Sequence, residues 1–259
     1  MHKYQRVFLF IISFSFFISC SKDATNTSEP TRIDRSGNLK ATGSSGEDLV
    51  SDARFTSMNV ELVYVNGNRP TDEALTVLKN FLERRTFKPD GITFNLRAVN
   101  SSGKAPFDID EIAQIERDER TAYNAGDEIA VFIYFADGSN ENDTNEKFVL
   151  GSSFRNTSMV IYERTIRNFS TRPGAPSRGA IEAATLNHEF GHLFGLVDLG
   201  TPLTSDHEDP NSEGHCDIAG CLMRANLEFG SGVVEMIEGG GIPDLREACI
   251  NDLQAIGGR

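Results

Sequence analysis

The sequence of 259 residues contains no tryptophan and is short of positive charge. Its 25 Lys and Arg stand against 38 Asp and Glu, which gives a formal net charge of −13. No run of Lys and Arg occurs along it, whereas nucleic-acid phosphates are bound by basic faces. We therefore expect no nucleic-acid partner. The composition is typical of an acidic surface that keeps a protein soluble.

Long apolar runs are also scarce. The run VFLFIISFSFFIS (7–19) is shorter than the roughly 20 residues that a membrane-spanning helix needs. Lys3 and Arg6 precede it and Cys20 follows, as in a signal peptide. Ile18-Ser19-Cys20 resembles a bacterial lipobox, although Phe17 stands where leucine is usual. We expect residues 1–19 to be a signal peptide and Cys20 to carry a lipid that anchors an exported, monomeric protein at the outer membrane or cell surface. A cleaved signal peptide without lipid is the alternative.

Cysteine is rare, with four in the chain. Three remain if Cys20 is lipidated, and an exported protein meets an oxidising environment. Cys216 and Cys221 are the natural disulfide pair and Cys249 is then left over, but the sequence does not resolve the pairing. The segment after Cys20 is polar and poor in aromatics, so residues 20–55 are expected to be a flexible tether and residues 56–259 the folded domain.

Periodicity predicts an α/β domain. Strands are expected at 59–65, 91–99 and 128–136, with two short ones within 148–164. Helices are expected from residue 71 or 72, over 108–122, from about 180 into Gly195, and from about 243 to 256. The predicted fold is a mixed sheet with one βαβ unit, a long helix that carries the site, and an irregular C-terminal part.

The histidines are concentrated in one window. Apart from His2, all of them lie between His188 and His215. His188 and His192 are four residues apart on a predicted helix, so both imidazoles can reach one zinc ion. Glu189, beside them, can take a proton from a water that the zinc acidifies to a pKa of about 7 and pass it to the leaving group. We predict a catalytic zinc site, with Gly195 turning the chain back by adopting a left-handed conformation.

The third zinc ligand stays open among three residues. Asp198, His207 and His215 all follow the HExxH motif within reach of a folded loop. His207 lies in the acidic stretch SDHEDP (205–210), so it is equally consistent with a surface histidine. The carboxylates of that stretch, from Asp206, Glu208 and Asp209, also raise the prospect of a structural calcium ion.

The sequence HEFGHLFGLVD (188–198) resembles the motif HExxHxxGxxH of the metzincin zinc peptidases, with Asp198 in the place of the last histidine. HCDIAGCLM (215–223) resembles the archaemetzincin pattern HCxxxxCxM, with residues 197–214 as an insertion before it. The resemblance favours His215 as the third ligand and Met223 as the methionine of the Met-turn. The family's further CxxC is missing, so a second, all-cysteine zinc is not expected and a Cys216–Cys221 disulfide is.

The resemblance implies a zincin-type fold in which an edge strand, here within 148–163, binds extended substrate. It also implies a zinc-dependent endopeptidase that acts on proteins or peptides, with zinc-bound water as nucleophile and Glu189 as general base and acid. Two alternatives remain at this point: an inactive binding module on the same fold, and a zinc hydrolase with a substrate other than protein.

Overall fold

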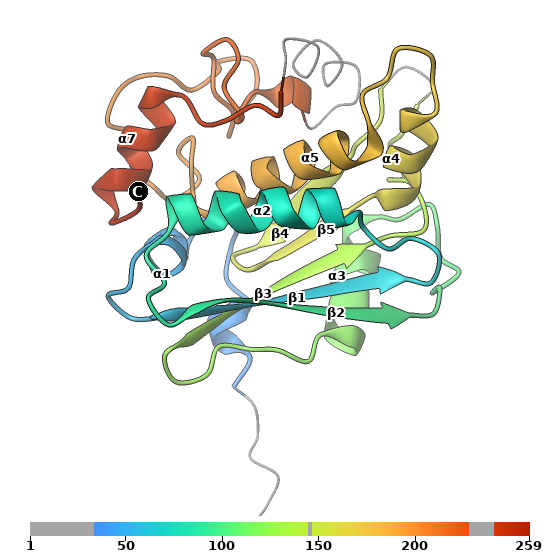
Figure 1. Cartoon of the computed structure of the whole chain (residues 1–259), viewed down its shortest axis with the longest axis horizontal. Helices are drawn as coiled ribbons and strands as arrows, with labels where there is room; N and C mark the ends of the chain where they lie inside the picture. The colour runs from blue at the N-terminus through green and yellow to red at the C-terminus, as the bar shows by residue number, and fades with distance from the viewer. Residues whose placement is uncertain (1–33, 145–146, 228–240) are drawn as a thin grey trace, which may run out of the picture. The chain divides into compact units, whose positions relative to one another are not determined.

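A computed structural model describes residues 34–144, 147–227 and 241–259 of the chain (Figure 1). The apolar N-terminal run and Cys20 lie outside these residues, so the leader and the lipid anchor stay predictions. Among the helices of the described ranges, none is long and apolar enough to cross a membrane.

A five-stranded sheet forms the centre of the fold, in the order β2-β1-β3-β5-β4. Its strands are β1 (Ser57–Val65), β2 (Gly91–Val99), β3 (Glu128–Phe135), β4 (Gly151–Arg155) and β5 (Ser158–Ile161). β2, β1, β3 and β5 pair in parallel, and β4 runs antiparallel to β5 at one edge. The mixed sheet that the sequence predicts is therefore present, including the βαβ unit over β1 and β2.

Helices lie on both faces of the sheet. They are α1 (Gly46–Val50), α2 (Asp72–Arg85), α3 (Ile109–Glu119), α4 (Glu163–Ser170), α5 (Arg178–Leu193) and α7 (Glu247–Ala255), with 3-10 turns at Ser36–Asn38 and Ala225–Leu227. α2 and α5 lie side by side over one face, and α3 lies against the other (Figure 1). The fold is thus mixed α/β, as predicted.

The side chains of β3 point alternately to the two faces of the sheet, which explains why a hydrophobic core forms on each face. Ile129, Val131 and Ile133 pack on the side of α2 and α5, whereas Phe132 and Tyr134 pack on the side of α3. Successive side chains of a strand point to opposite faces, so a continuous apolar run belongs to a strand that is covered on both sides. β3 is such a strand, and it gives α5 a rigid support.

Two elements differ from the sequence-based expectation. Residues 163–170 form helix α4, whereas the sequence predicts a short strand up to residue 164 and no helix here, because Ile166 and Phe169 supply only a short helical pattern. The last helix begins at Glu247 rather than near Pro243. The irregular chain of residues 194–224 carries much of the candidate site.

The folded chain also begins earlier than residue 56. Asn38, Leu49 and Val50 are fully buried, so the expected tether through residue 55 is wrong for residues 34–55. The Asn38 amide donates to the carbonyl oxygen of Ala130 and to Thr157 Oγ1, at 3.1 and 3.0 Å. A polar segment can be ordered in this way because long-range hydrogen bonds replace an apolar face.

A pair of buried carboxyl groups joins three helices beside the sheet. Glu182 of α5 accepts hydrogen bonds from the backbone amide and the hydroxyl of Thr71, at the start of α2. Glu163, the first residue of α4, lies next to Glu182 and shares Arg178 with it. Burial, and then the charge of Glu182, raise the pKa of Glu163 to about 9 in spite of Arg178. The folded protein therefore keeps a proton on Glu163 at neutral pH.

This proton makes stability fall as pH rises. The folded state binds more protons than the unfolded state between the ordinary pKa of a glutamate and about 9, so the free energy of unfolding declines across that window. Glu163→Gln removes this contribution, and its advantage over the wild type should grow from pH 5 to pH 8 by at most about 1.4 kcal/mol per pH unit. Urea unfolding at several pH values measures it, with the exposed Glu83→Gln as control. Parallel pH profiles for Glu163→Gln and the wild type would contradict the assignment.

Candidate metal centre

Helix α5 carries the HExxH motif through the interior of the domain. The Ser177 hydroxyl accepts a hydrogen bond from the Ala180 amide at its start. All residues from Ile181 to Leu193 are buried, because the sheet, α2, α4 and the C-terminal chain surround the helix. A helix that is buried on every side holds its side chains in fixed directions, which suits a site of defined geometry.

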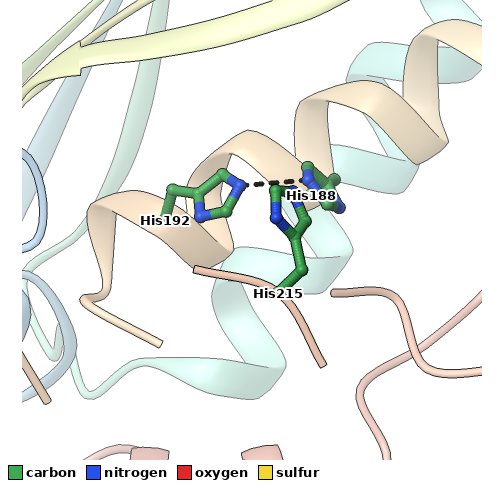
Figure 2. A group of neighbouring side chains, drawn as sticks. All are labelled: His188, His192 and His215. Carbon is green, nitrogen blue, oxygen red and sulfur yellow. Dashed lines mark hydrogen bonds between the residues drawn. The ribbon is translucent and has the colours of Figure 1, made fainter. Parts of the chain in front are cut away.

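Three histidines meet at the C-terminal half of α5. The Nε2 atoms of His188 and His192 are 3.1 Å apart. The ring of His215 approaches from the irregular chain, with its centroid 5.3 Å from that of His188 and 5.0 Å from that of His192 (Figure 2). One ring nitrogen from each of the three lies within 4.8 Å of the others. The structure thus brings His215 to the pair that the sequence places on one helix face.

Backbone carbonyls fix the orientation of two of these rings. His188 Nδ1 donates to the carbonyl oxygen of Leu222 at 2.8 Å, and His215 Nδ1 donates to that of Glu213 at 3.0 Å. A histidine that donates from Nδ1 keeps Nε2 as the nitrogen with a lone pair. Carbonyl partners of this kind set the tautomer of metal-ligating histidines, so both Nε2 atoms are prepared for a ligand role.

The distances and the burial fit a zinc ion. Around a tetrahedral ion with Zn–N bonds of about 2.0–2.1 Å, ligand nitrogens lie about 3.3 Å from one another, close to the 3.1 Å between His188 and His192. Burial, followed by the charges of His188 and His215, holds the pKa of His192 well below its usual value. A neutral imidazole is the form that binds metal, so the site favours the required protonation state without a cation present.

Glu189 lies between the histidines and the edge strand β4. It is 1 % exposed, and the Ser153 hydroxyl lies 3.0 Å from its Oε2 atom and 2.9 Å from its carbonyl oxygen. A Cβ atom added at Gly151 would lie 3.0 Å from the Cγ atom of Glu189, so this glycine lets the strand pack against the carboxylate. Neither Ser153 nor Gly151 could be singled out from the sequence, which indicated an edge strand here without its register.

A methionine forms the floor beneath the histidines. A Cβ atom added at Gly191 would lie 2.1 Å from Met223 Sδ, so the sulfur touches the backbone of α5 between His188 and His192. Met223 is fully buried, and its carbonyl oxygen accepts from the Cys216 amide at 2.7 Å. The HC and CxM parts of the C-terminal motif are therefore joined by backbone pairing next to His215.

The chain leaves α5 through the predicted glycine turn. Gly195 has φ 77°, and a Cβ atom there would lie 2.8 Å from the Gly43 carbonyl oxygen. Left-handed backbone of this kind ends helices and reverses the chain. The prediction for Gly195 is confirmed, and the N-terminal segment packs directly on the turn.

The other two ligand candidates lie elsewhere. Asp198 is exposed on the turn, in left-handed backbone at φ 64°. His207 is 2 % exposed and its Nε2 atom lies 2.7 Å from Asp252 Oδ2 of α7, so it is not the surface histidine that its acidic neighbours indicated. Within the described ranges, neither residue joins the group of three histidines.

Two further expectations about this region change. Cys216, Cys221 and Cys249 are free thiols, so the expected Cys216–Cys221 disulfide is not formed. The calcium site gains no support, since Glu208 and Asp209 accept hydrogen bonds from their own loop at Gly214 and Asn211. No group of three close ligands among the described residues includes either carboxylate.

The comparisons with known proteins agree with this geometry at the level of the fold. The crystal structure of archaemetzincin from Methanopyrus kandleri matches with a TM-score of 0.50 and 16% sequence identity, covering 78% of this chain and 97% of that chain. The chain has the archaemetzincin fold. No family model matches the sequence, and no curated protein matches it. The zincin-type architecture that the sequence predicts is thereby confirmed, while the likeness at this identity carries the fold alone.

The contact between Gly191 and Met223 predicts that Gly191→Ala destabilises the protein, although the same substitution inside a helix is usually stabilising. Gly→Ala inside a helix usually stabilises a protein by about 1 kcal/mol. Gly191→Ala should instead destabilise the metal-free protein by about 1–3 kcal/mol, because the new methyl group has to displace the Met223 sulfur. Equilibrium urea unfolding measures the change.

The matched control is the same substitution with the sulfur removed. In a Met223→Ala background, Gly191→Ala should regain its normal stabilising sign. A stabilising Gly191→Ala in the wild-type background would show that Met223 does not lie against α5.

Proposed function

We propose that this chain is a zinc-dependent peptidase that cleaves internal peptide bonds of proteins or peptides. The observation that carries the proposal is the convergence of His188, His192 and His215, all at most 7 % exposed, at helix α5, which also carries the buried carboxylate of Glu189. Three imidazole ligands leave a fourth position open, which is the arrangement of catalytic rather than structural zinc. The fold shared with archaemetzincin is consistent with this chemistry.

The chain's own residues have distinct parts in the reaction. Zinc, when bound, supplies a Lewis acid that polarises a carbonyl group and lowers the pKa of water to about 7. His188 and His215 hold their Nε2 atoms toward it because Leu222 and Glu213 occupy their Nδ1 protons. Met223 packs its sulfur against α5 at Gly191, between the two histidines of that helix.

Glu189 is the residue that moves the proton. Its carboxylate accepts a proton from the attacking water and returns it to the departing amine nitrogen, which needs one carboxylate near both atoms. The Ser153 hydroxyl, 3.0 Å from Oε2, restricts the rotation of that carboxylate. Ser153 is thus a positioning residue for Glu189.

The edge strand β4 offers a binding surface for an extended substrate. It pairs with β5 on one side only and lies directly against Glu189. An extended peptide can add to such an edge through main-chain hydrogen bonds. Thr42 already donates to the Ser153 carbonyl oxygen at 3.3 Å, so the substrate would pair with the part of β4 before Ser153.

We also propose that the enzyme is attached to a membrane. Lipidation of Cys20 would attach it, as a monomer, to the outer membrane or the cell surface, where protein substrates are met from outside the cell. The N-terminal pattern Lys3, Arg6 and the apolar run before Cys20 supports this part, together with the net charge of −13, which disfavours nucleic acid as a substrate.

Replacing the carboxylate separates metal binding from catalysis. Glu189→Gln keeps the shape of the side chain and can still bond to Ser153, but it cannot accept the proton. It should retain zinc and lose activity on a broad peptide library by about 10²–10⁴-fold. The exposed Glu83→Gln serves as control. Undiminished cleavage by Glu189→Gln would rule out the mechanism, and a wild type that binds zinc without cleaving any peptide would favour a binding module or another substrate.

Two of the candidates for the third ligand, His215 and Asp198, are separated by the zinc affinity of their variants. His215→Ala should weaken binding at this site severely and abolish cleavage, since two imidazoles cannot hold a catalytic zinc alone. Asp198→Ala, which changes an exposed side chain, should keep both affinity and activity. Competition with a chromophoric chelator gives the affinities. Full affinity in His215→Ala together with loss in Asp198→Ala would reverse the ligand assignment.

A further inference from the structure

A second cluster of metal-ligand side chains lies behind His215. Cys216, Cys221 and Cys249 are fully buried, and ligand atoms of His207, Cys216 and Cys249 lie within 4.8 Å of one another. Cys221 Sγ is 3.6 Å from Cys249 Sγ. A disulfide needs sulfur atoms about 2.05 Å apart, whereas thiolates around one zinc ion with bonds of about 2.3 Å stand about 3.8 Å apart. The 3.6 Å spacing excludes a disulfide between Cys221 and Cys249 and fits two thiolates on one metal ion.

The histidine of this cluster is already oriented. His207 Nε2 lies 2.7 Å from Asp252 Oδ2, and Asp252 is itself fixed by the amide and hydroxyl of Thr204, both 2.6 Å from its Oδ1 atom. His207 Nδ1, by contrast, is buried and has no hydrogen-bond partner among the described residues. A carboxylate on one ring nitrogen, with the other nitrogen left for a ligand, is the arrangement found behind metal-binding histidines.

We propose that Cys216, Cys221, Cys249 and His207 form a second metal centre that binds a thiolate-preferring divalent ion such as zinc. Ligand atoms of His207, Cys216 and Cys249 already lie within 4.8 Å of one another, and Cys221, whose sulfur is 3.6 Å from that of Cys249, would supply the fourth ligand of a closed tetrahedron, as in structural zinc sites. Alternatively, the three cysteines could be reduced thiols that pack as small apolar groups. That alternative does not explain why the buried His207 Nδ1 has no hydrogen-bond partner among the described residues. The sequence argues against an all-cysteine zinc site because the CxxC motif is missing. The proposed site instead has three cysteines and His207, which lies in the insertion of residues 197–214.

This centre would hold the third ligand of the first one in place. Asp209 N donates to the His215 carbonyl oxygen at 2.7 Å, and Asp217 N donates to that of His207 at 2.9 Å, so the segments around the two histidines pair as a short bridge. Cys249 and Asp252 both belong to α7. A metal ion would therefore tie α7, the loop of His207 and the loop of His215 together.

Cobalt substitution tests the second centre separately from the first. Thiolate bound to cobalt(II) gives a near-ultraviolet charge-transfer band, which a site of three histidines cannot give. The full chain should bind two equivalents of cobalt and show this band. His192→Ala should lose one equivalent and keep the band, whereas Cys249→Ser and His207→Ala should each lose the equivalent that His192→Ala retains. Asp252→Asn should weaken the second site by about 10–100-fold. Asp198→Asn, on the same loop, is the control.

The wild-type protein alone can overturn the proposal. A cobalt spectrum without the thiolate band, or a disulfide among these cysteines in the isolated protein, would each contradict it, whether or not the variants fold. A single bound equivalent that shows the band would retain the second centre and reject metal binding at the three histidines. The outcome is independent of the proposed peptidase activity. An inactive protein that still shows two equivalents and the band would reject the activity and retain the second centre.

Discussion

Three imidazole rings meet inside this protein with a ring nitrogen of each within 4.8 Å of the others, and much of the structure around α5 serves that arrangement. Burying His188, His192 and His215 together removes them from water and sets their like charges against one another, which lowers the pKa of His192. Such a group is costly unless each ring has a defined partner. The carbonyl oxygens of Leu222 and Glu213 supply partners for two of them.

The surrounding contacts come from distant parts of the chain. Gly191 gives the Met223 sulfur its place against the helix, and Gly195 returns the chain beneath it. Gly43 of the N-terminal segment packs on that return, and α7 supplies Asp252 to His207. The site is therefore a property of the whole domain rather than of the HExxH helix. Two metal ions, one open and one closed, would give the irregular C-terminal chain the rigidity that it lacks from helices and strands.

What the sequence reveals depends on how local each signal is. The pairing of His188 with His192, the role of Gly195 and the buried strand β3 follow from spacing, so they could be predicted. The order of the N-terminal segment could not, because the amide of Asn38 is satisfied by Ala130 and Thr157, about a hundred residues away. His207 was equally hidden, since its acidic neighbours indicate a surface while its true partner is 45 residues later. Ser153 depends on the register of β4, which composition does not encode.

An anomalous difference map collected at the zinc absorption edge from crystals of the full chain would test the central claim most directly. We predict a peak about 2.0–2.1 Å from the Nε2 atoms of His188, His192 and His215, with Glu189 beside its open position. A peak in which Asp198 replaces His215, or the absence of any peak between these histidines in zinc-loaded protein, would contradict it.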